Sequence, residues 1–392
     1  MRITKDDCTI QGFSFSGGLL EWLGNRLSLV RNGTDTWRLG VALALLTWGV
    51  LMLLAFLQGL GHKVLSPGTI GVHVRLLVAI PLFFACETLV APRMAEFIRN
   101  ITRAGVVPEA ELPALNGSIR RVRRMMGSVL PEVLLLLVVF ALPLIQAVAH
   151  LPIRTGNWAP ILDQAGGRLV WAHSWYLGFC LPLFQFLMLR WLWRLGLWWY
   201  FLWRVSRLRL NLVAIHSDGA GGLGYLEIVH EHFIPLVLAI SAVLSADFSE
   251  ALFSQTMVFD ALYRLALIAL LLTVVLFIVP LLVFFRRLWV CRRTAMSEYM
   301  IMAARYVNAF DRKWVRDEQA SGESQLGTPD LQSLADLTNS VNVASRMRII
   351  PVSRRLVVEL AVSVILPFTP LIFVKYNLDE LAVRLFGMLS GR

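Results

Sequence analysis

The stretch LALIALLLTVVLFIVPLLVFF, from Leu265 to Phe285, contains no charged residue and only one proline, Pro280. A helix needs about 20 apolar residues to cross a bilayer, because each residue advances it by about 1.5 Å through roughly 30 Å of hydrocarbon. The stretch therefore predicts a transmembrane helix. Of the 392 residues, 57% are hydrophobic and 16% charged, against roughly 45–50% and about 25% in a soluble domain. The whole composition is that of a membrane protein.

Further apolar stretches complete a predicted all-α transmembrane helical bundle of about seven spans. The other spans are expected at Leu39 to Gly61, about Leu76 to Pro92, about Val129 to Ile153, Leu169 to Leu189, Phe233 to Ala246 and Leu356 to Val374. The span at Phe233 is long enough only if it includes the Glu and His residues before it. The last span is interrupted by Pro367 and Pro370.

These spans divide the chain into four parts. Residues 1–38 form an amino-terminal segment with an amphipathic helix at 16–31, expected to lie on the membrane surface. Residues 39–285 form a six-span membrane domain with a glycine-rich loop at 210–226. Residues 286–355 form a helical segment outside the membrane, in which Thr328 and Pro329 are a good helix start. Residues 356–392 hold the seventh span and a short tail.

The distribution of positive charge predicts the orientation. Only eight of the 37 Lys and Arg residues fall on alternate connections, namely Lys63, Arg75, Arg154, Arg168, Arg264, Lys375, Arg384 and Arg392. Because Lys and Arg are retained on the cytosolic side, we expect a cytosolic amino terminus, a periplasmic tail and a cytosolic 286–355 segment in a multi-pass protein of the bacterial cytoplasmic (inner) membrane. Topology thus accounts for the net charge of +11, and no nucleic-acid partner is expected.

The connection with the most chemical groups is LNLVAIHSDGAGGLGYLEIVHEHF, from Leu210 to Phe233. Backbone amides in a glycine loop that opens a helix can hold an anion or phosphate. The predicted ligand- or anion-binding loop comprises His216, Asp218, Gly219, Gly221, Gly222 and Gly224. The alternative is a tight turn that returns the chain to the membrane.

The same connection contains candidate ligands for a divalent metal: Asp218, Glu227 and His230. Glu227 and His230 have the i, i+3 spacing that places both on one helical face, as in di-iron bundles. Those bundles need a second such motif, which the sequence lacks. Polar residues at a hydrated helix end are the alternative interpretation, and the sequence identifies no cofactor.

Ionisable residues also occur within or near the predicted spans: Glu87, Glu132, Arg190, Arg194 and Glu359. Charges in hydrocarbon are costly and often mark ion pathways. Arg190 and Arg194 are four residues apart and share a helical face, so an acid–arginine pair that only holds helices together is the alternative.

Two stretches of the chain resemble a family of bacterial inner-membrane proteins with no assigned activity. They are IHSDGAGGLGYLE, which begins at Ile215, and SLADLTNSVNVASRMRIIP, which begins at Ser333. Members carry a His-Pro-Asp-x-Ala-Gly-Gly-Leu-Gly-Phe loop and a Ser-Leu-Ala-Asp-Leu helix. This chain departs from the pattern at Ser217, in place of Pro, and at Tyr225, in place of Phe. The resemblance implies the fold class and a bacterial origin.

Three functions are compatible with these observations. The first is an ion or small-solute channel or transporter that contacts membrane lipids and is expected to form a homo-oligomer. The second is a membrane enzyme in which His216 and Asp218 act on a lipid headgroup or phosphate. The third is a non-catalytic scaffold that docks another protein. The sequence identifies no catalytic residue, and a channel or transporter is the favoured function.

Overall fold

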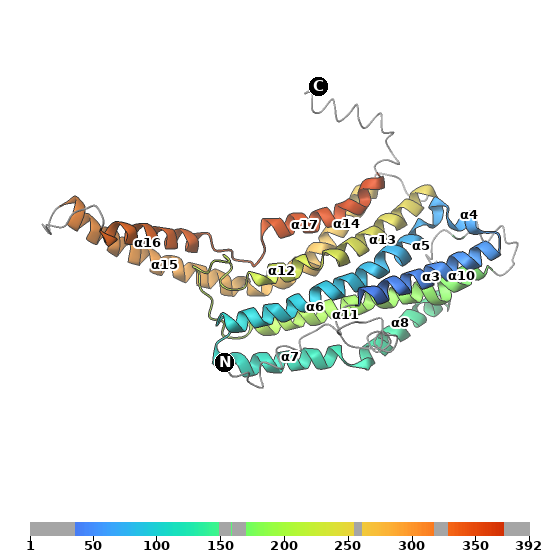
Figure 1. The fold of residues 1–392 in the computed structure, drawn as a ribbon, viewed down its shortest axis with the longest axis horizontal. Coiled ribbons are helices and arrows are strands. Elements are labelled where there is room, and N and C mark those ends of the chain that lie inside the picture. Colours follow the sequence, from blue (N-terminus) through green and yellow to red (C-terminus); the bar gives the residue numbers. More distant parts are fainter. Residues whose placement is uncertain (1–35, 149–157, 159–169, 255–260, 317–327, 372–392) are drawn as a thin grey trace, which may run out of the picture.

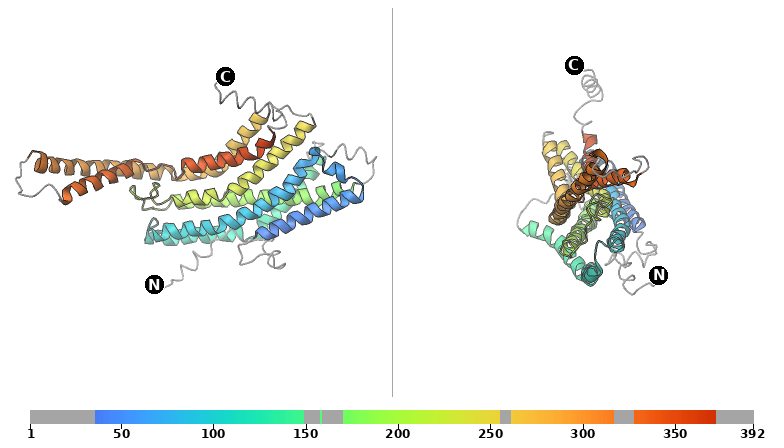
Figure 2. Two further views of the ribbon diagram at one scale, coloured as in Figure 1. Left: turned by 45° about the horizontal axis from the view of Figure 1, so that its top comes forward. Right: turned by 90° about the vertical axis from the view of Figure 1, so that its left-hand side faces the viewer.

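The computed structural model describes residues 36–148, 158, 170–254, 261–316 and 328–371. The described residues form helices and connections without a strand, so the fold is the predicted all-α bundle. The helices run nearly along one long axis, and a two-helix arm extends beyond the bundle (Figures 1 and 2). The predicted helix at 16–31 lies outside the described residues.

The helices of the bundle have the following bounds: α3 Trp37–Leu57, α4 Gly61–Val64, η1 Pro67–Thr69, α5 Ile70–His73, η2 Val74–Ala79, α6 Ile80–Arg103, η3 Glu109–Glu111, α7 Leu112–Met126, α8 Val129–Val148, α10 Trp171–Trp175, η4 Tyr176–Cys180, α11 Leu181–Ser206, α12 Tyr225–Glu231, α13 Ile234–Phe253, α14 Ala261–Thr273, η5 Val274–Ile278 and η6 Val279–Phe284. The remaining helices are α15 Phe285–Phe310, η7 Asp311–Val315, α16 Pro329–Ser345, α17 Arg354–Ile365 and η8 Leu366–Phe368. Helix α6 packs against α3 and α13, α11 packs against α7 and α8, and α13 packs against α17.

Among the described residues, five continuous helical stretches are long and apolar enough to cross a membrane. They are Trp37–Leu57, Pro67–Arg103, Trp171–Ser206, Tyr225–Phe253 and Ala261–Val315. A sixth arises if Glu109–Met126 and Val129–Ala141, bent by 43° at their junction, form one span. The protein is therefore an integral, multi-pass membrane protein.

The described residues thus hold fewer spanning helices than the seven predicted. The predicted seventh span forms the 12-residue helix α17, which passes into a 3-10 turn at Leu366–Phe368. Pro367 lies inside that turn and cannot supply the backbone N–H that a continuing helix requires. Residues 372–374 of this stretch lie outside the described residues, and the sides of the two termini remain a prediction.

Helix α3 marks the thickness of the apolar layer. Its 21 residues extend over about 31 Å, which matches the hydrocarbon core. At its start, the Thr36 N–H donates to Thr88 Oγ1 at 3.1 Å, and just beyond its end Gln58 Oε1 accepts from the Trp171 N–H at 2.8 Å. The layer therefore lies between the levels of Thr88 and Trp171.

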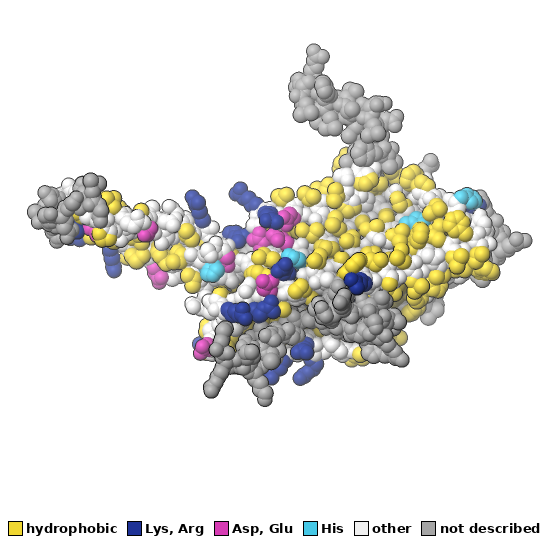
Figure 3. All heavy atoms as spheres, viewed as in Figure 1, with side chains coloured by type: hydrophobic (Ala, Val, Ile, Leu, Met, Phe, Trp, Pro, Cys, Tyr) yellow, Lys and Arg dark blue, Asp and Glu magenta, His cyan; other side chains and the backbone are white. Residues whose placement is uncertain are grey.

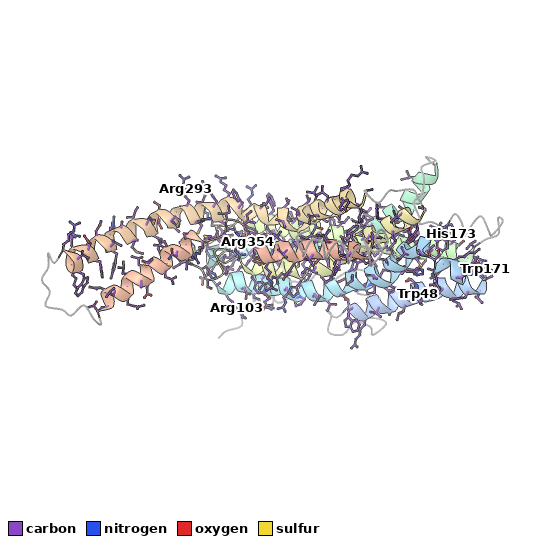
Figure 4. The ribbon with its side chains drawn as sticks, turned by 90° about the horizontal axis from the view of Figure 1, so that it is seen from above. Trp48, Arg103, Trp171, His173, Arg293 and Arg354 are labelled. Carbon is purple, nitrogen blue, oxygen red and sulfur yellow. The ribbon has the colours of Figure 1, made fainter. Side chains whose placement is uncertain are left out.

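The two longest bundle helices continue past this layer. Pro67–Arg103 and Trp171–Ser206 have 37 and 36 residues, or about 55 Å each. Figure 3 shows the apolar surface over one half of the bundle and most of the visible charged side chains over the other. In Figure 4, Trp171 and His173 lie at the apolar end, whereas Arg103, Arg293 and Arg354 lie toward the arm. We call the end with residues 208–224 the loop end and the end with α5 and α10 the opposite end.

Gly40 and Gly49 provide a matched test of the α3–α6 contact. A Cβ on Gly40 would lie 2.6 Å from Cβ of Phe84, whereas a Cβ on Gly49 meets nothing within 4 Å. Gly40→Ala is expected to destabilise the protein by about 1–3 kcal/mol through overpacking. Gly49→Ala is expected to stabilise it by about 0.5–1 kcal/mol, since alanine favours a helix over glycine. Thermal unfolding in detergent measures both; equal effects of the two substitutions would refute this packing.

Candidate functional site

The glycine-rich loop connects α11 to α12 and folds around one of its own side chains. Asp218 Oδ1 accepts hydrogen bonds from the backbone N–H of Ala220 at 2.8 Å and of Gly222 at 3.2 Å. Asp218 Oδ2 accepts from the N–H of Gly224 at 2.7 Å. The amides that were expected to hold an external anion therefore surround an internal carboxylate.

The loop requires glycine for two separate reasons. Gly219, Gly221 and Gly222 have φ of 62°, 66° and 96°, a region that side chains with a Cβ rarely adopt. At Gly224, a Cβ would lie 2.7 Å from Cβ of Asp218, so glycine is needed for close approach to the carboxylate. The loop is thus the tight turn of the alternative interpretation, with its anion supplied from within.

His216 completes the loop at its surface. Its Nδ1 lies 2.9 Å from Asp218 Oδ1, and its side chain is 37% exposed. Burial of the Asp218 carboxyl opposes ionisation, but the three backbone amides and His216 outweigh it, so the pKa of Asp218 lies below its usual range. The loop therefore presents an imidazole next to an ionised, fixed carboxylate.

Arg348, between α16 and α17, fastens the loop to α12. Its side chain donates to Glu227 Oε2 at 2.6 Å and to the Asp218 carbonyl at 2.8 Å. Its backbone N–H donates to the Gly219 carbonyl at 2.8 Å. The two stretches that carry the family resemblance therefore meet at this residue. Sequence reasoning did not select Arg348, although the quoted motif contains it.

The predicted metal ligands do not converge. Asp218 is occupied by the loop amides, and Glu227 pairs with Arg348. His230 is 1% exposed, its Nδ1 lies 2.8 Å from the Leu226 carbonyl, and its ring is 6.3 Å from that of Trp198. Among the described residues, no group of three His, Cys, Asp or Glu could hold a metal ion. The prediction of a metal site at these residues is therefore wrong: they point to different partners.

Four of the predicted intramembrane ionisable residues form one buried cluster, the Glu87 network. Arg190 donates to Glu87 Oε2 at 3.1 Å and to Glu132 Oε1 at 3.2 Å. Arg194 Nη1 lies 2.9 Å from Glu87 Oε1. The four side chains are 4–6% exposed, and two positive charges balance two negative ones. The network joins α6, α8 and α11 at the level where α3 begins, beside Thr88.

Glu359 does not belong to this network. It pairs with Arg355 one helical turn away at 2.7 Å, and the side chain of Arg355 is 74% exposed. The structure thus separates Glu359 from the other four ionisable residues that were predicted within or near the spans. The carboxylate lies near the start of α17, where its arginine partner reaches solvent or headgroups.

A second cluster, the Arg75 network, lies toward the opposite end. Arg75 donates to the hydroxyl of Tyr176 at 2.8 Å and pairs with Asp247. Glu250, 6% exposed, accepts from the Gly71 N–H at 2.7 Å and lies within electrostatic range of Arg75. Sequence reasoning placed Arg75 in a connection and overlooked Asp247 and Glu250. Their i, i+3 spacing near the end of an apolar helix was the available signal.

No protein-family model, curated protein or solved structure matches this chain.

Asp218→Asn tests the internal carboxylate. The side-chain amide of asparagine has one oxygen and one NH₂ group, so it would turn a donor toward at least one of the three backbone N–H groups. Protection of the loop N–H groups from hydrogen exchange should therefore fall by about tenfold to a hundredfold at pH 7. The pKa of Asp218 is lower in the folded protein than in the unfolded chain. The ionised carboxylate therefore stabilises the folded loop fully above the unfolded pKa of about 3.9, and this stabilisation is lost as the pH falls through the folded pKa.

The measurement is hydrogen exchange by mass spectrometry on peptides covering 215–226, with rates corrected for pH. Asp336→Asn on α16 is the control, because the Asp336 carboxylate accepts from the Gln332 side chain four residues away on an exposed helix face. Unchanged protection in Asp218→Asn at pH 7 would contradict the proposed role of the carboxylate.

Proposed function

We propose that this protein is a channel or transporter for a proton, a cation or another small solute in the bacterial cytoplasmic membrane. The supporting observation is the pair of buried charge networks toward the two ends of the apolar layer. Burying a charge costs several kcal/mol unless a partner neutralises it. Charged residues within a membrane bundle commonly belong to an ion or proton pathway.

The two networks are separated along the bundle. Arg75 and Glu87 are 12 residues apart on the continuous stretch Pro67–Arg103, about 18 Å. Tyr176 and Arg190 are 14 residues apart on Trp171–Ser206, about 21 Å. The layer between them is apolar, with the rings of Phe83 and Phe184 stacked at 6.0 Å. A transport path needs a closure on each side of such a layer. Each network could form one closure, because it ties three helical segments together.

The charge of the Arg75 network favours a positive substrate. Arg75 faces two carboxylates, Asp247 and Glu250. A proton or a cation would therefore balance the excess negative charge. Asp247 is the accessible member, since its side chain is 41% exposed. A positive substrate would compete with Arg75 for these carboxylates and loosen this end of the bundle.

The local helix geometry agrees with a moving element. Arg75 lies in the π-helical segment η2, and Tyr176 begins the π-helical segment η4. A third π segment, η5, precedes the 3-10 segment that contains Pro280. Such segments have fewer regular i→i−4 bonds and recur at functional sites and hinges.

Reconstitution into liposomes tests this function. The wild-type protein should carry protons or monovalent cations faster than empty vesicles, measured with an internal pH dye and a potassium- or sodium-sensitive dye. Asp247→Asn should lower the rate by about tenfold or more, because it removes the accessible charge of the Arg75 network. Glu359→Gln should leave the rate unchanged, since Glu359 pairs outside both networks.

Each variant must elute from gel filtration as the wild type does before its rate is compared. Absence of flux for protons, monovalent cations and divalent cations would overturn the proposal. Equal loss of flux in Glu359→Gln and Asp247→Asn would also count against it.

A second candidate, a membrane enzyme acting on a lipid headgroup or phosphate, is favoured by the contact between His216 and Asp218. The half-exposed imidazole and its ionised partner have the arrangement of a general base and the group that orients it. Under this hypothesis, His216→Gln should abolish conversion of radiolabelled bacterial phospholipids by purified protein, seen by thin-layer chromatography. Arg123→Gln is the control. If wild-type protein forms no product, this candidate fails.

A further inference from the structure

A cavity of about 770 Å³ lies between the segment that precedes the glycine loop and the first half of α15. Its polar lining comprises Arg286, Arg287, Asn211, Thr294, Tyr299 and Glu298, and its apolar lining includes Val213 and Val290. Cys291 also lines it, and its Sγ lies 3.4 Å from the Leu212 carbonyl. His216, Asp218 and the glycines of the loop do not line this cavity, and neither do the side chains of the two charge networks.

The two arginines of the cavity differ from their neighbours on the same helix. Arg292 donates to the Ser345 carbonyl at 2.6 Å, and Arg293 lies over the ring of Trp289 at 5.3 Å. Arg286 and Arg287 are exposed and have no hydrogen bond or ion pair with any described residue. The cavity therefore holds two guanidiniums whose donors remain available to a ligand. Guanidinium forks match the oxygens of phosphate and carboxylate groups, and two adjacent guanidiniums suit the higher charge of a phosphate.

The position of the cavity indicates an amphiphile. Arg286 directly follows the apolar run that ends at Phe285. Exposed apolar side chains lead from this run to the cavity: Val279, Leu282, Phe285, Val290 and Val213 are 40–48% exposed. A headgroup at the arginines would leave its acyl chains along this strip, in the apolar layer.

We propose that this cavity binds a phosphate-bearing organic ligand, with the phosphate on Arg286 and Arg287 and an anionic phospholipid as the favoured source. A volume of about 770 Å³ lies within the roughly 300–1,000 Å³ range of small-molecule sites, so inorganic phosphate alone would leave most of it empty. Thr294 and Tyr299 add hydroxyl donors further along α15. Glu298 also lines that part of the cavity, and its negative charge would repel a second phosphate.

Native mass spectrometry of the full chain in detergent tests the site. Phosphatidylglycerol is the anionic probe, phosphatidylcholine the zwitterionic lipid, and glycerol 3-phosphate the soluble phosphate. Wild-type protein should retain phosphatidylglycerol, and Arg286→Gln with Arg287→Gln should weaken this retention by about tenfold or more, since charge-assisted hydrogen bonds are lost.

Arg123→Gln with Arg124→Gln is the matched control. It removes the same charge from exposed residues of α7 that do not line the cavity, and it should retain the lipid as the wild type does. Binding of phosphatidylglycerol but not of glycerol 3-phosphate identifies a lipid as the source; binding of both identifies a soluble phosphate as a sufficient source. Equal loss in the two double variants, or no loss in either, would overturn the site.

A second measurement needs no arginine variant. In a chain with Cys8, Cys86 and Cys180 changed to serine, Cys291 is the remaining cysteine. Its alkylation should be at least about fivefold slower in vesicles containing phosphatidylglycerol than in phosphatidylcholine alone, because the ligand covers the cavity wall. Equal alkylation rates in the two vesicles would contradict occupation of the cavity.

Discussion

The neutralisation of buried charge is the constraint on which this bundle depends. Glu87 lies between two guanidiniums, and Arg190 reaches on to Glu132, so that three helices meet at four side chains without net charge. Removing one member would leave an uncompensated buried charge, which costs about 3–5 kcal/mol. A network of this kind fixes the register of α6, α8 and α11 more strictly than apolar packing can, because leucines tolerate sliding and ion pairs do not.

The same constraint explains the glycine loop. Backbone N–H groups that converge on one point need an acceptor, and the loop supplies Asp218 six residues or fewer away from each of them. Glycine-rich loops in other proteins hold a phosphate on such N–H groups. In this loop the N–H groups bind the loop's own Asp218. The partly exposed ring of His216 is the loop's accessible titratable group, and Arg348 holds the loop through the carbonyls of Asp218 and Gly219.

Local sequence was sufficient to predict the helices and their apolar runs, because hydropathy depends only on neighbouring residues. It also selected Glu87, Glu132, Arg190 and Arg194, since charges in apolar runs stand out. It could not show that Arg348 reaches a loop 130 residues earlier, which depends on how α16 and α17 pack. Nor could it show that Arg75, near the end of a span, lies buried in a π-helical segment, because the register of a π segment follows from tertiary contacts.

The span lengths give the Glu87 network a position that the sequence left open. Arg190 follows Trp171 by 19 residues, about 28 Å of helix, so the Glu87 network lies at the edge of the apolar layer and not at its centre. A charge cluster at the membrane centre would suit a binding site, whereas one at the edge suits a closure that water can reach when helices separate.

Hydrogen bonds join the arm, the loop and the bundle on the loop side of the Glu87 network. Arg292 of α15 binds the end of α16, and Arg348 just beyond α16 binds both the loop and α12. Helix α12 continues through His232 and Phe233 into α13, within the continuous stretch Tyr225–Phe253, and α13 carries Asp247 and Glu250. Arg348 therefore links the arm to the continuous helical stretch that carries two carboxylates of the Arg75 network.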